Sequence, residues 1–408
     1  MNTGITRSGA EFIALIALSM SLVALSIDSM LPALGSIAAD LGARAPNDRQ
    51  LVLTVFFAGL TVGLLVYGPI SDSIGRKPTM YIGVALYILG GLLCAFAPNF
   101  TVMICGRILQ GFGAGSPRIV AIAMVRDLHG GRNMARIMSF VMAIFILVPI
   151  LAPSIGQAIL FVAPWRAIFL VLVGIGTIFL CWFAVRQPET HPPEARVEFS
   201  AAAIFSAGRQ VLAHPITLGY MLATGLIFGA FISYLGTSQQ IFQEQYGLGN
   251  LFPVFFGILA AGIGAASIVN ARLVMRLGMR LLSKWALRAS CSLSLGFLAI
   301  AWALGGHPPL SLFMAYMLVC FFCNGLLFSN YNALAMEPMG HIAGVAAAVT
   351  GAVATLVALV TGSLIGRAYD GTVIPLVAGF ALLSLAALIV TEWAERKRTA
   401  IPPPSKPR

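Results

Sequence analysis

Charged residues are scarce in this sequence. Asp, Glu, Lys and Arg make up only 10% of its 408 residues, whereas the hydrophobic types make up 59%. A soluble domain carries roughly 25% charged residues. The composition therefore excludes an ordinary water-soluble fold and predicts a protein whose outer surface mostly contacts lipid.

The residue groups that most enzymes and metal sites need are also missing. The six cysteines all lie in apolar runs and none clusters with a histidine. The stretch CFFC at 320–323 spells a redox motif, but no strand pattern adjoins it, so we expect plain helix packing there. No Ser-His-Asp set and no glycine-rich phosphate loop is present, which excludes an ATP-driven pump and leaves a membrane receptor or enzyme as a remote alternative. We expect no metal ion and no other cofactor.

Long apolar runs dominate what is present. A helix crosses the hydrocarbon core in about 20 residues, and by that length the sequence predicts twelve spans. They lie at about residues 11–34, 50–70, 79–97, 100–125, 135–161, 165–186, 215–240, 251–275, 281–304, 309–335, 342–367 and 373–393. Transmembrane strands would need a period-two alternation, which is absent. The sequence thus predicts an all-α membrane protein whose first apolar run is an uncleaved span and not a signal peptide.

A polar, proline-bearing break separates the spans into two sets of six. The expected parts are an N-terminal six-helix bundle over 1–186, a cytoplasmic central loop over 187–214 with a short interfacial helix near Phe199–Leu212, a C-terminal six-helix bundle over 215–395, and a basic cytoplasmic tail over 396–408. The loop SDSIGRKP, with Gly75, has a faint repeat in MRLGMR, with Gly278, at an offset of 278 − 75 = 203 residues. Two pseudo-symmetric halves with a site between them are typical of secondary transporters.

The basic residues predict the orientation of the spans. Most of the 25 Lys and Arg residues fall on segments that share one side of the membrane if both termini are cytoplasmic. Because Lys and Arg accumulate in cytoplasmic loops, we expect that orientation. In a soluble protein the net charge of +11 would suggest nucleic acid, but here it follows from those loops, and we expect no nucleic-acid partner.

One carboxylate lies deep within a predicted span. Asp28 is the only one of the 14 acidic residues so placed, and a charge at bilayer depth costs about 2.5–3.5 kcal/mol on insertion scales. At 1.5 Å per residue it lies roughly 9 Å below the outer end of its span, and Arg107 in the fourth span lies roughly 10 Å below the same edge. The two can pair, either as a structural bridge or as a proton-coupling site. In the second case Asp28 is the member that titrates, because arginine keeps its proton.

Several other residues within the spans are candidates for a cavity or a helix contact. Arg118 either reaches the cytoplasmic interface or lines a cavity. Pro149 and Pro153 should weaken or kink the fifth span. Glycines four residues apart allow close helix contact, as at Gly59/Gly63, Gly111/Gly115, Gly225/Gly229 and Gly362/Gly366. Polar side chains that could face a ligand are Gln110, Gln157, Tyr234, Gln239, Gln240, Asn324 and Asn330.

The loop after the second span resembles the signature loop of the major facilitator superfamily. That loop reads GPISDSIGRKP, and the matching residues are Gly68, Asp72, Gly75, Arg76 and Lys77, while Ser73 stands where a basic residue is usual.

Two further motifs resemble those of proton-coupled exporters in the same superfamily. GRILQGFGAG is similar to the span 4 signature through Arg107, Gln110 and Gly111. LAPSIGQ, in the span that also holds Pro149, is similar to the span 5 antiporter motif through Pro153 and Gly156, with Ala152 and Gln157 replacing two of its glycines.

Shorter stretches narrow the resemblance to a subfamily. SIDSMLPAL, VRDL, WRAIF and NARLV look like the bicyclomycin/chloramphenicol-resistance (Bcr/CflA-type) exporters. The resemblance implies a drug:proton antiporter of the bacterial inner membrane in which Asp28 and Arg107 couple protons to transport. It also implies a cytoplasmic latch made of Gly68, Asp72, Gly75, Arg76 and Asp127. In that latch Asp72 would cap a neighbouring helix N-terminus, and Arg76 would bind Asp127 through paired donors.

The expected function is proton-driven export of small amphipathic drugs by alternating access. A proton from outside would neutralise Asp28, free Arg107 and favour the inward-facing state, and a cytoplasmic substrate would then displace the proton. One acid beside at least one arginine disfavours dications, so we expect neutral or zwitterionic, phenicol-like cargo. The expected substrate contacts are Asp28, Gln110, Arg118, Tyr234, Gln239, Asn324 and Asn330.

An alternative function fits the same expected fold. A proton-coupled metabolite exporter or importer would share its architecture, since fold does not fix cargo. In either case the expected partners are a small-molecule substrate, protons and the lipid bilayer, and we expect a monomer.

Overall fold

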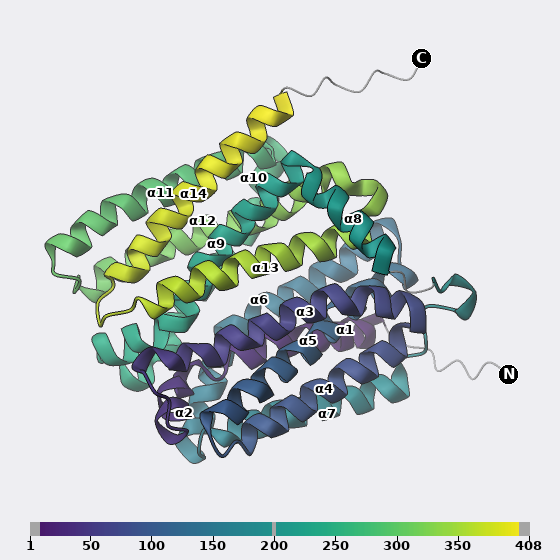
Figure 1. Ribbon diagram of the computed structural model, residues 1–408, viewed down its shortest axis with the longest axis horizontal. Coiled ribbons are helices and arrows are strands. Elements are labelled where there is room, and N and C mark those ends of the chain that lie inside the picture. The colour runs from purple at the N-terminus through teal and green to yellow at the C-terminus, as the bar shows by residue number, and fades with distance from the viewer. Residues whose placement is uncertain (1–8, 198–200, 400–408) are drawn as a thin grey trace. The chain divides into compact units, whose positions relative to one another are not determined.

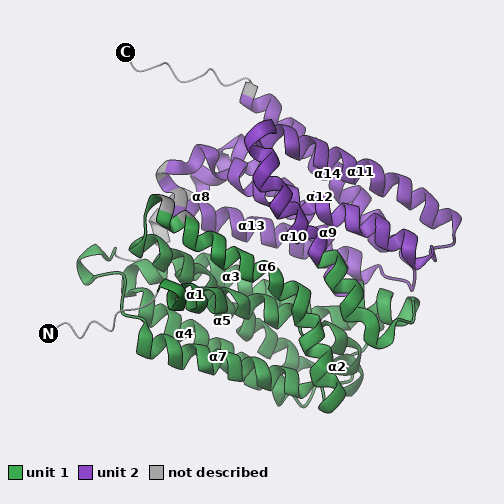
Figure 2. Cartoon of the chain, turned by 180° about the vertical axis from the view of Figure 1, so that it is seen from behind, with its two compact units in different colours: residues 1–199, 238–260 green, residues 200–237, 261–408 purple. Residues whose placement is uncertain are grey.

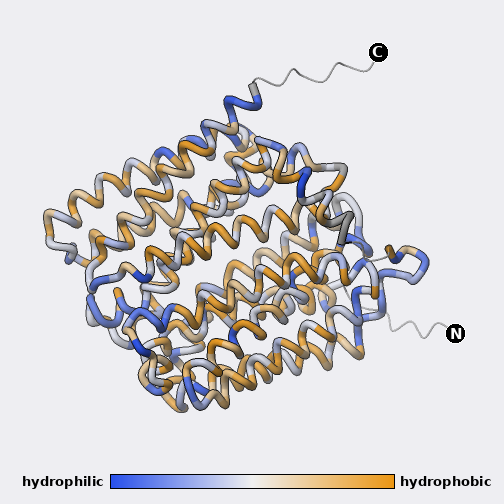
Figure 3. Tube along the Cα trace, viewed as in Figure 1, coloured by the Kyte–Doolittle hydropathy of each residue, from blue (hydrophilic) through white to orange (hydrophobic). Residues whose placement is uncertain are grey.

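Residues 9–197 and 201–399 are described by a computed structural model (Figure 1). Within these ranges, twelve helical segments are long and apolar enough to cross a membrane, which confirms the predicted all-α fold with twelve spans. The hydropathy view shows apolar residues along the helices, with many polar residues in the connections and at helix ends (Figure 3). Long apolar helices suit a bilayer because each satisfies its own backbone hydrogen bonds.

The chain divides into two compact units, shown in Figure 2. Unit 1 comprises Met1–Phe199 and Ser238–Ala260, and unit 2 comprises Ser200–Thr237 and Ala261–Arg408. The segment Ser238–Ala260 thus groups with helices that precede it by more than fifty residues. Residues 400–408, within the expected basic tail, and Phe199 and Ser200, at the start of the expected interfacial helix, lie outside the described residues.

The first part of the chain forms most of unit 1. Its helices are α1 (Gly9–Asp28), η1 (Leu31–Ala33), α2 (Leu34–Asp40), η2 (Pro46–Gln50), α3 (Leu51–Ile74), α4 (Arg76–Ala95), α5 (Phe100–Leu128), α6 (Gly131–Val162), α7 (Arg166–Arg186) and η3 (Pro193–Ala195).

The rest of the chain forms unit 2 and returns once to unit 1. Its helices are α8 (Ala201–Ala213), α9 (Pro215–Gln239), the π-helical turn η4 (Gln240–Gln245), η5 (Gly249–Leu251), α10 (Phe252–Leu277), α11 (Met279–Ala303), α12 (Leu310–Met336), η6 (Glu337–Ile342), α13 (Ala343–Arg367) and α14 (Ile374–Thr399). Helix α8 agrees with the expected short helix in the central loop. The first four residues of the expected tail are the last turn of α14.

The first span departs from its expected form. A continuous helix was expected over about 11–34, but α1 ends at Asp28 and the chain continues through η1 into α2. Pro32 gives a reason: it has no backbone N–H, so it cannot donate to the carbonyl of Asp28 four residues earlier. The break therefore falls at the one acidic residue that the sequence places deep in a span.

Glycines let α5 approach its neighbours closely. A Cβ on Gly111 would lie 2.0 Å from the carbonyl oxygen of Phe56 in α3, and one on Gly59 would lie 2.1 Å from that of Ile108. In unit 2, a Cβ on Gly362 of α13 would lie 2.8 Å from the carbonyl oxygen of Gly229 in α9. These contacts agree with the close approach expected from the spacing of the glycines.

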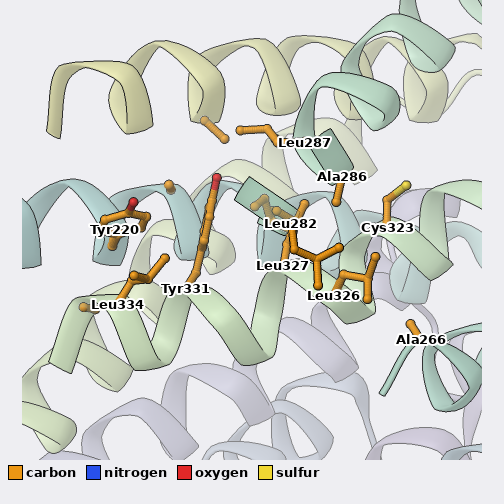
Figure 4. Packing of buried hydrophobic residues seen from close by; sticks show 14 of the residues in the cluster. Tyr220, Ala266, Leu282, Ala286, Leu287, Cys323, Leu326, Leu327, Tyr331 and Leu334 are labelled. Carbon is orange, nitrogen blue, oxygen red and sulfur yellow. The ribbon is translucent and has the colours of Figure 1, made fainter. Parts of the chain in front are cut away.

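Unit 2 has its own apolar core. Figure 4 shows part of it, where Leu282 and Leu287 of α11 pack near Leu327 and Tyr331 of α12 and Tyr220 of α9. The two tyrosine rings lie 5.1 Å apart, edge to face, an arrangement that aromatic pairs prefer.

Candidate functional site

Asp28 lies at the break of the first span. Asp28 is only 5% exposed. Among the described residues its carboxyl group takes part in no hydrogen bond or ion pair. A buried carboxyl without a partner is costly when ionised. Ionisation of Asp28 in this position would therefore leave an unpaired charge in the interior of unit 1.

Gly156 brings the fifth span against this break. A Cβ on Gly156 would lie 1.7 Å from the carbonyl oxygen of Ser29, the residue next to Asp28. Pro149 and Pro153 precede it within α6, which continues through both prolines as one helix. The structure thus places a residue of the expected antiporter motif beside the backbone that follows Asp28.

Arg107 is completely buried, but the expected direct pair with Asp28 is absent from the described residues. Its donors are already used: Nε donates to the carbonyl of Val52 at 3.0 Å, and Nη2 donates to that of Ser26 at 3.1 Å. Nη1 donates to Oε1 of Gln110 at 2.6 Å. Arg107 therefore holds the backbone two residues before Asp28, and not the carboxyl itself.

Aromatic residues complete the surroundings of Arg107. Its guanidinium lies 4.3 Å from the centre of the Phe56 ring, a favourable position for a cation over a π face. The Tyr87 and Ser26 hydroxyls are 2.7 Å apart, which joins α4 to α1 in the same buried cluster. Sequence reasoning missed Tyr87 because a tyrosine inside an apolar span is far more often plain packing.

Arg118 behaves differently from Arg107 on the same helix. It lies eleven residues further along α5, about 16 Å at 1.5 Å per residue, and its side chain is exposed. Within the described ranges Arg118 has no recorded hydrogen bond or ion pair. Both expected roles of Arg118, reaching the cytoplasmic interface or lining a cavity, stay open.

The expected latch residues are brought together at the opposite end of unit 1 from the Asp28 break. Arg76 is 2% exposed, and its Nε and Nη2 contact the two carboxylate oxygens of Asp127 at 2.8 and 3.4 Å. Its Nη1 donates to Asp72 at 2.5 Å and to Ser71 at 2.8 Å. The Ser71 hydroxyl in turn donates to the carbonyl of Gly68 at 2.8 Å.

Gly75 makes the turn that presents Arg76. Its φ of 106° lies in the region that residues with a side chain rarely adopt. A Cβ there would also lie 2.7 Å from a carboxylate oxygen of Glu189. The glycine of this loop is therefore required by both its backbone conformation and its neighbour.

Glu189 caps α4, a role that was expected of Asp72. The Glu189 carboxylate accepts from the backbone N–H groups of Arg76 at 3.0 Å and Lys77 at 2.9 Å, the first two residues of the helix. It also accepts from the N–H groups of Thr190 and His191, both at 2.9 Å. Asp72 instead binds the Arg76 side chain.

The environment of Glu189 changes its acidity. Burial raises the pKa of this carboxyl, but the backbone donors of His191, Lys77, Arg76 and Thr190 together outweigh burial and hold the pKa below its usual value. Sequence reasoning missed this residue. The only available signal was a lone acid in the central loop, and nothing in the sequence places that loop beside α4.

Unit 2 repeats the arrangement of the latch. Gly278 has a φ of 78° and precedes α11 as Gly75 precedes α4. Arg280 forms ion pairs with Glu337, at the end of α12, and with Glu395 of α14 at 3.2 Å. The faint sequence repeat therefore has a partial structural counterpart, although Arg280 is 31% exposed and lies one position further from its glycine than Arg76 does.

The remaining expected ligand contacts are divided between the units. In unit 2, Asn330 donates to Asn270 at 2.9 Å, Asn324 is buried, and the ring of Tyr234 lies 4.8 Å from that of Phe321. In unit 1, Gln239 accepts from Arg49 at 2.8 Å.

Two other glutamines with polar partners also belong to unit 1. Gln240 accepts from Gln50 at 2.9 Å, and Gln157 donates to Asn250 at 3.2 Å.

Groups of three or more potential metal ligands are absent from the described residues.

The chain resembles known transporters along most of its length. The family model of the Major Facilitator Superfamily matches residues 16–362. The chain is 33% identical over 84% of its length to the uncharacterised MFS-type transporter YdgK of Bacillus subtilis, covering 85% of that protein. It is 30% identical over 94% of its length to a bicyclomycin resistance protein homolog of Haemophilus influenzae, covering 94% of that protein.

Two further likenesses are more partial or more distant. Over 54% of its length the chain is 32% identical to the multidrug resistance protein MdtL of Klebsiella pneumoniae, covering 55% of that protein. The crystal structure of the human organic anion transporter MFSD10 (TETRAN) matches this chain with a TM-score of 0.65 and 17% sequence identity. The match covers 95% of this chain and 100% of that one, and at this identity it shows the fold alone. The chain therefore belongs to the major facilitator superfamily, as a multi-pass secondary transporter of small molecules and not an enzyme, and it is distantly related to drug-resistance exporters.

Proposed function

We propose that this transporter exports small amphipathic drugs in exchange for protons, with Asp28 as the proton carrier. The observation that carries the proposal is the Asp28 carboxyl itself, buried at a break in a span and without a recorded partner among the described residues. Such a group must take up a proton or gain a donor, so its protonation can be coupled to movement of the helices around it.

Arg107 would link the protonation state of Asp28 to movement of α1. Its bond to the Ser26 carbonyl, two residues before Asp28, suits a protonated Asp28 that needs no counter-charge. Loss of the proton would create a carboxylate that competes for the same guanidinium, and a charge-assisted bond is stronger than one to a neutral carbonyl. Arg107 would then move toward Asp28 and pull the break in α1 with it.

The relatives support drug export as the kind of transport. A bicyclomycin resistance protein homolog is 30% identical over 94% of the chain, and an MdtL multidrug resistance protein is 32% identical over 54% of it. We propose neutral or zwitterionic, phenicol-like cargo, because one acid and Arg118, which has no ion-pair partner within the described ranges, disfavour a dication. The proposed substrate contacts are Asp28, Gln110, Arg118, Tyr234, Gln239, Asn324 and Asn330.

The setting of the transporter is part of the proposal. We place it as a monomer in the bacterial cytoplasmic membrane, with two six-helix bundles over 1–186 and 215–395 and both termini in the cytoplasm. The cluster around Arg76 would act as the cytoplasmic latch during alternating access, and Gly156 would act as part of the antiporter motif.

The coupling role of Asp28 is tested by drug-dependent proton release from everted vesicles. Asp28→Asn keeps the shape of the side chain but cannot carry a proton, so we expect drug-dependent proton flux to fall to background while the folded protein is still inserted. Asp40→Asn is the matched control, because Asp40 lies on the same span at its outer end and pairs with Arg166. Coupled flux at the wild-type rate in Asp28→Asn would overturn the assignment.

The cargo is tested by resistance profiling in a host that lacks its own exporters. We expect expression of the chain to raise resistance to phenicol-like compounds and to leave resistance to dications unchanged. Strong resistance to dications with none to phenicols would contradict the proposed cargo.

A further inference from the structure

Unit 2 contains a cavity that the proposed transport cycle does not use. Its volume is about 300 Å³, and its walls come from α9, α11, α12 and α14. It lies where α11 begins and α14 ends, so the cavity is at the end of the spans and not at their middle.

Most charges in the cavity wall neutralise one another. Arg280 and Arg398 both contact Glu395, at 3.2 and 2.9 Å, and Glu392 accepts from Arg288 at 3.2 Å. Lys284 also lines the cavity, and within the described ranges it takes part in no recorded ion pair or hydrogen bond. The cavity therefore presents one uncommitted positive charge.

A buried hydroxyl beside Lys284 is also left without a partner. Ser283 is 2% exposed and lines the cavity, and its Oγ has no hydrogen-bond partner among the described residues. The other hydroxyls of the wall have partners: those of Tyr331 and Thr391 bind one another at 3.1 Å, and that of Tyr220 donates to Glu395 at 2.5 Å. Because buried polar groups are nearly always hydrogen-bonded, the unpartnered Ser283 hydroxyl favours a polar group as its neighbour at the cavity wall.

The surroundings indicate that this occupant also has an apolar part. Leu281 lines the cavity and is 46% exposed, and Trp285, next to Lys284, is 63% exposed. Trp393 of α14 is 40% exposed. Tryptophan is enriched at the level of the lipid headgroups, so the cavity lies where a headgroup would meet its acyl chains.

We propose that this cavity binds the headgroup of an anionic phospholipid. A phosphate oxygen would accept from Nζ of Lys284 and from Oγ of Ser283, and an acyl chain would lie along Leu281 and Trp285. Basic pockets between membrane helices recognise anionic lipids in this way. The site would make the transporter sensitive to the lipid composition of its membrane.

The test measures lipid binding to the purified full-length chain. Thermal unfolding is followed in neutral detergent with added phosphatidylglycerol, phosphatidylcholine or inorganic phosphate. Because a ligand of the folded state raises the melting temperature by mass action, we expect only phosphatidylglycerol to raise it. Its apparent Kd should rise at least tenfold in Lys284→Gln and several-fold in Ser283→Ala, and should stay near wild type in Lys284→Arg.

A charge-matched control separates the cavity from general attraction to anionic lipid. Arg272→Gln removes one exposed cation from α10, outside the cavity, and should leave the apparent Kd unchanged. Three results would each overturn the lipid site. The first is an equal rise in melting temperature with phosphatidylcholine, and the second is a full rise with inorganic phosphate alone. The third is an equal loss of phosphatidylglycerol affinity in Arg272→Gln and Lys284→Gln. Should Lys284→Gln not be recoverable, Ser283→Ala serves the same comparison. Lipid binding is read without transport, so failure of the proposed export leaves this result unaffected.

Discussion

At the scale of single residues, Gly156 is the most tightly constrained position around Asp28. A Cβ on Gly156 would lie 1.7 Å from the Ser29 carbonyl oxygen, far below van der Waals contact, and this oxygen belongs to the backbone. A change of side-chain rotamer cannot relieve the clash, so a side chain here must push α6 away from the break in α1.

This constraint gives a direct prediction for Gly156→Ala. Overpacking typically costs about 1–3 kcal/mol, so we expect a lower melting temperature together with loss of drug-dependent proton flux, because the backbone beside Asp28 is displaced. The control is Gly174→Ala in α7, where nothing lies within 4 Å of an added Cβ. Alanine there should be neutral or stabilising by about 0.5–1 kcal/mol. Equal stability and flux in both variants would contradict the close contact.

The relative level of residues on two helices could be predicted from the sequence, but their partners could not. Counting residues along two spans put Asp28 and Arg107 at one level, and the structure brings Arg107 to Ser26, two residues from Asp28. The count gives no rotation of either helix about its axis. It also ignores backbone carbonyls, which are the acceptors that two of the Arg107 donors use.

At the scale of elements, α4 depends on a residue outside the helix. Its first two N–H groups are bound by Glu189, more than one hundred residues away in the chain. The first N–H groups of a helix have no partner within it, and a carboxylate there also interacts favourably with the helix dipole. The central loop thus stabilises the start of α4 and, through it, the position of Arg76.

The contact between Glu189 and α4 should depend on pH. The pKa of Glu189 is lowered in the folded protein, so its contribution is fully present above the ordinary pKa of about 4.5 and is lost as the pH falls through the lowered value. Amide hydrogen exchange, corrected for intrinsic rates, should therefore show weaker protection of the Arg76 and Lys77 amides in that acidic range.

Substitution of Glu189 should reproduce the effect at neutral pH. Glu189→Gln removes the charge and should weaken protection at the first turn of α4. Glu194→Gln, an exposed acid in η3 of the same loop, should have no effect. Unchanged protection in Glu189→Gln would show that the cap does not stabilise α4.

At the scale of the whole molecule, the twelve spans were predictable because hydrophobic length is a strong, local signal. The break in the first span was harder to predict than the spans themselves. Pro32 marks it, but a proline near the end of an expected span can also simply end the helix. The grouping of Ser238–Ala260 with unit 1 could not be predicted, because its contacts, such as that of Gln50 with Gln240, join residues far apart in the chain.

The orientation of the whole molecule gives the last prediction. With both termini in the cytoplasm, the connection between α2 and α3 faces outward and the end of α10 faces inward, where Arg272, Arg276 and Arg280 accumulate. We expect Arg44→Cys to react with a membrane-impermeant maleimide on intact cells, and Met275→Cys, at an 85% exposed position, to react only after permeabilisation. Exposed Cys105 and Cys181 are first replaced by serine, so that labelling reports only the new thiols. The reversed pattern would place the arginine-rich segments outside and contradict the charge rule in this protein, and with it the inward direction of proton entry that the export cycle requires.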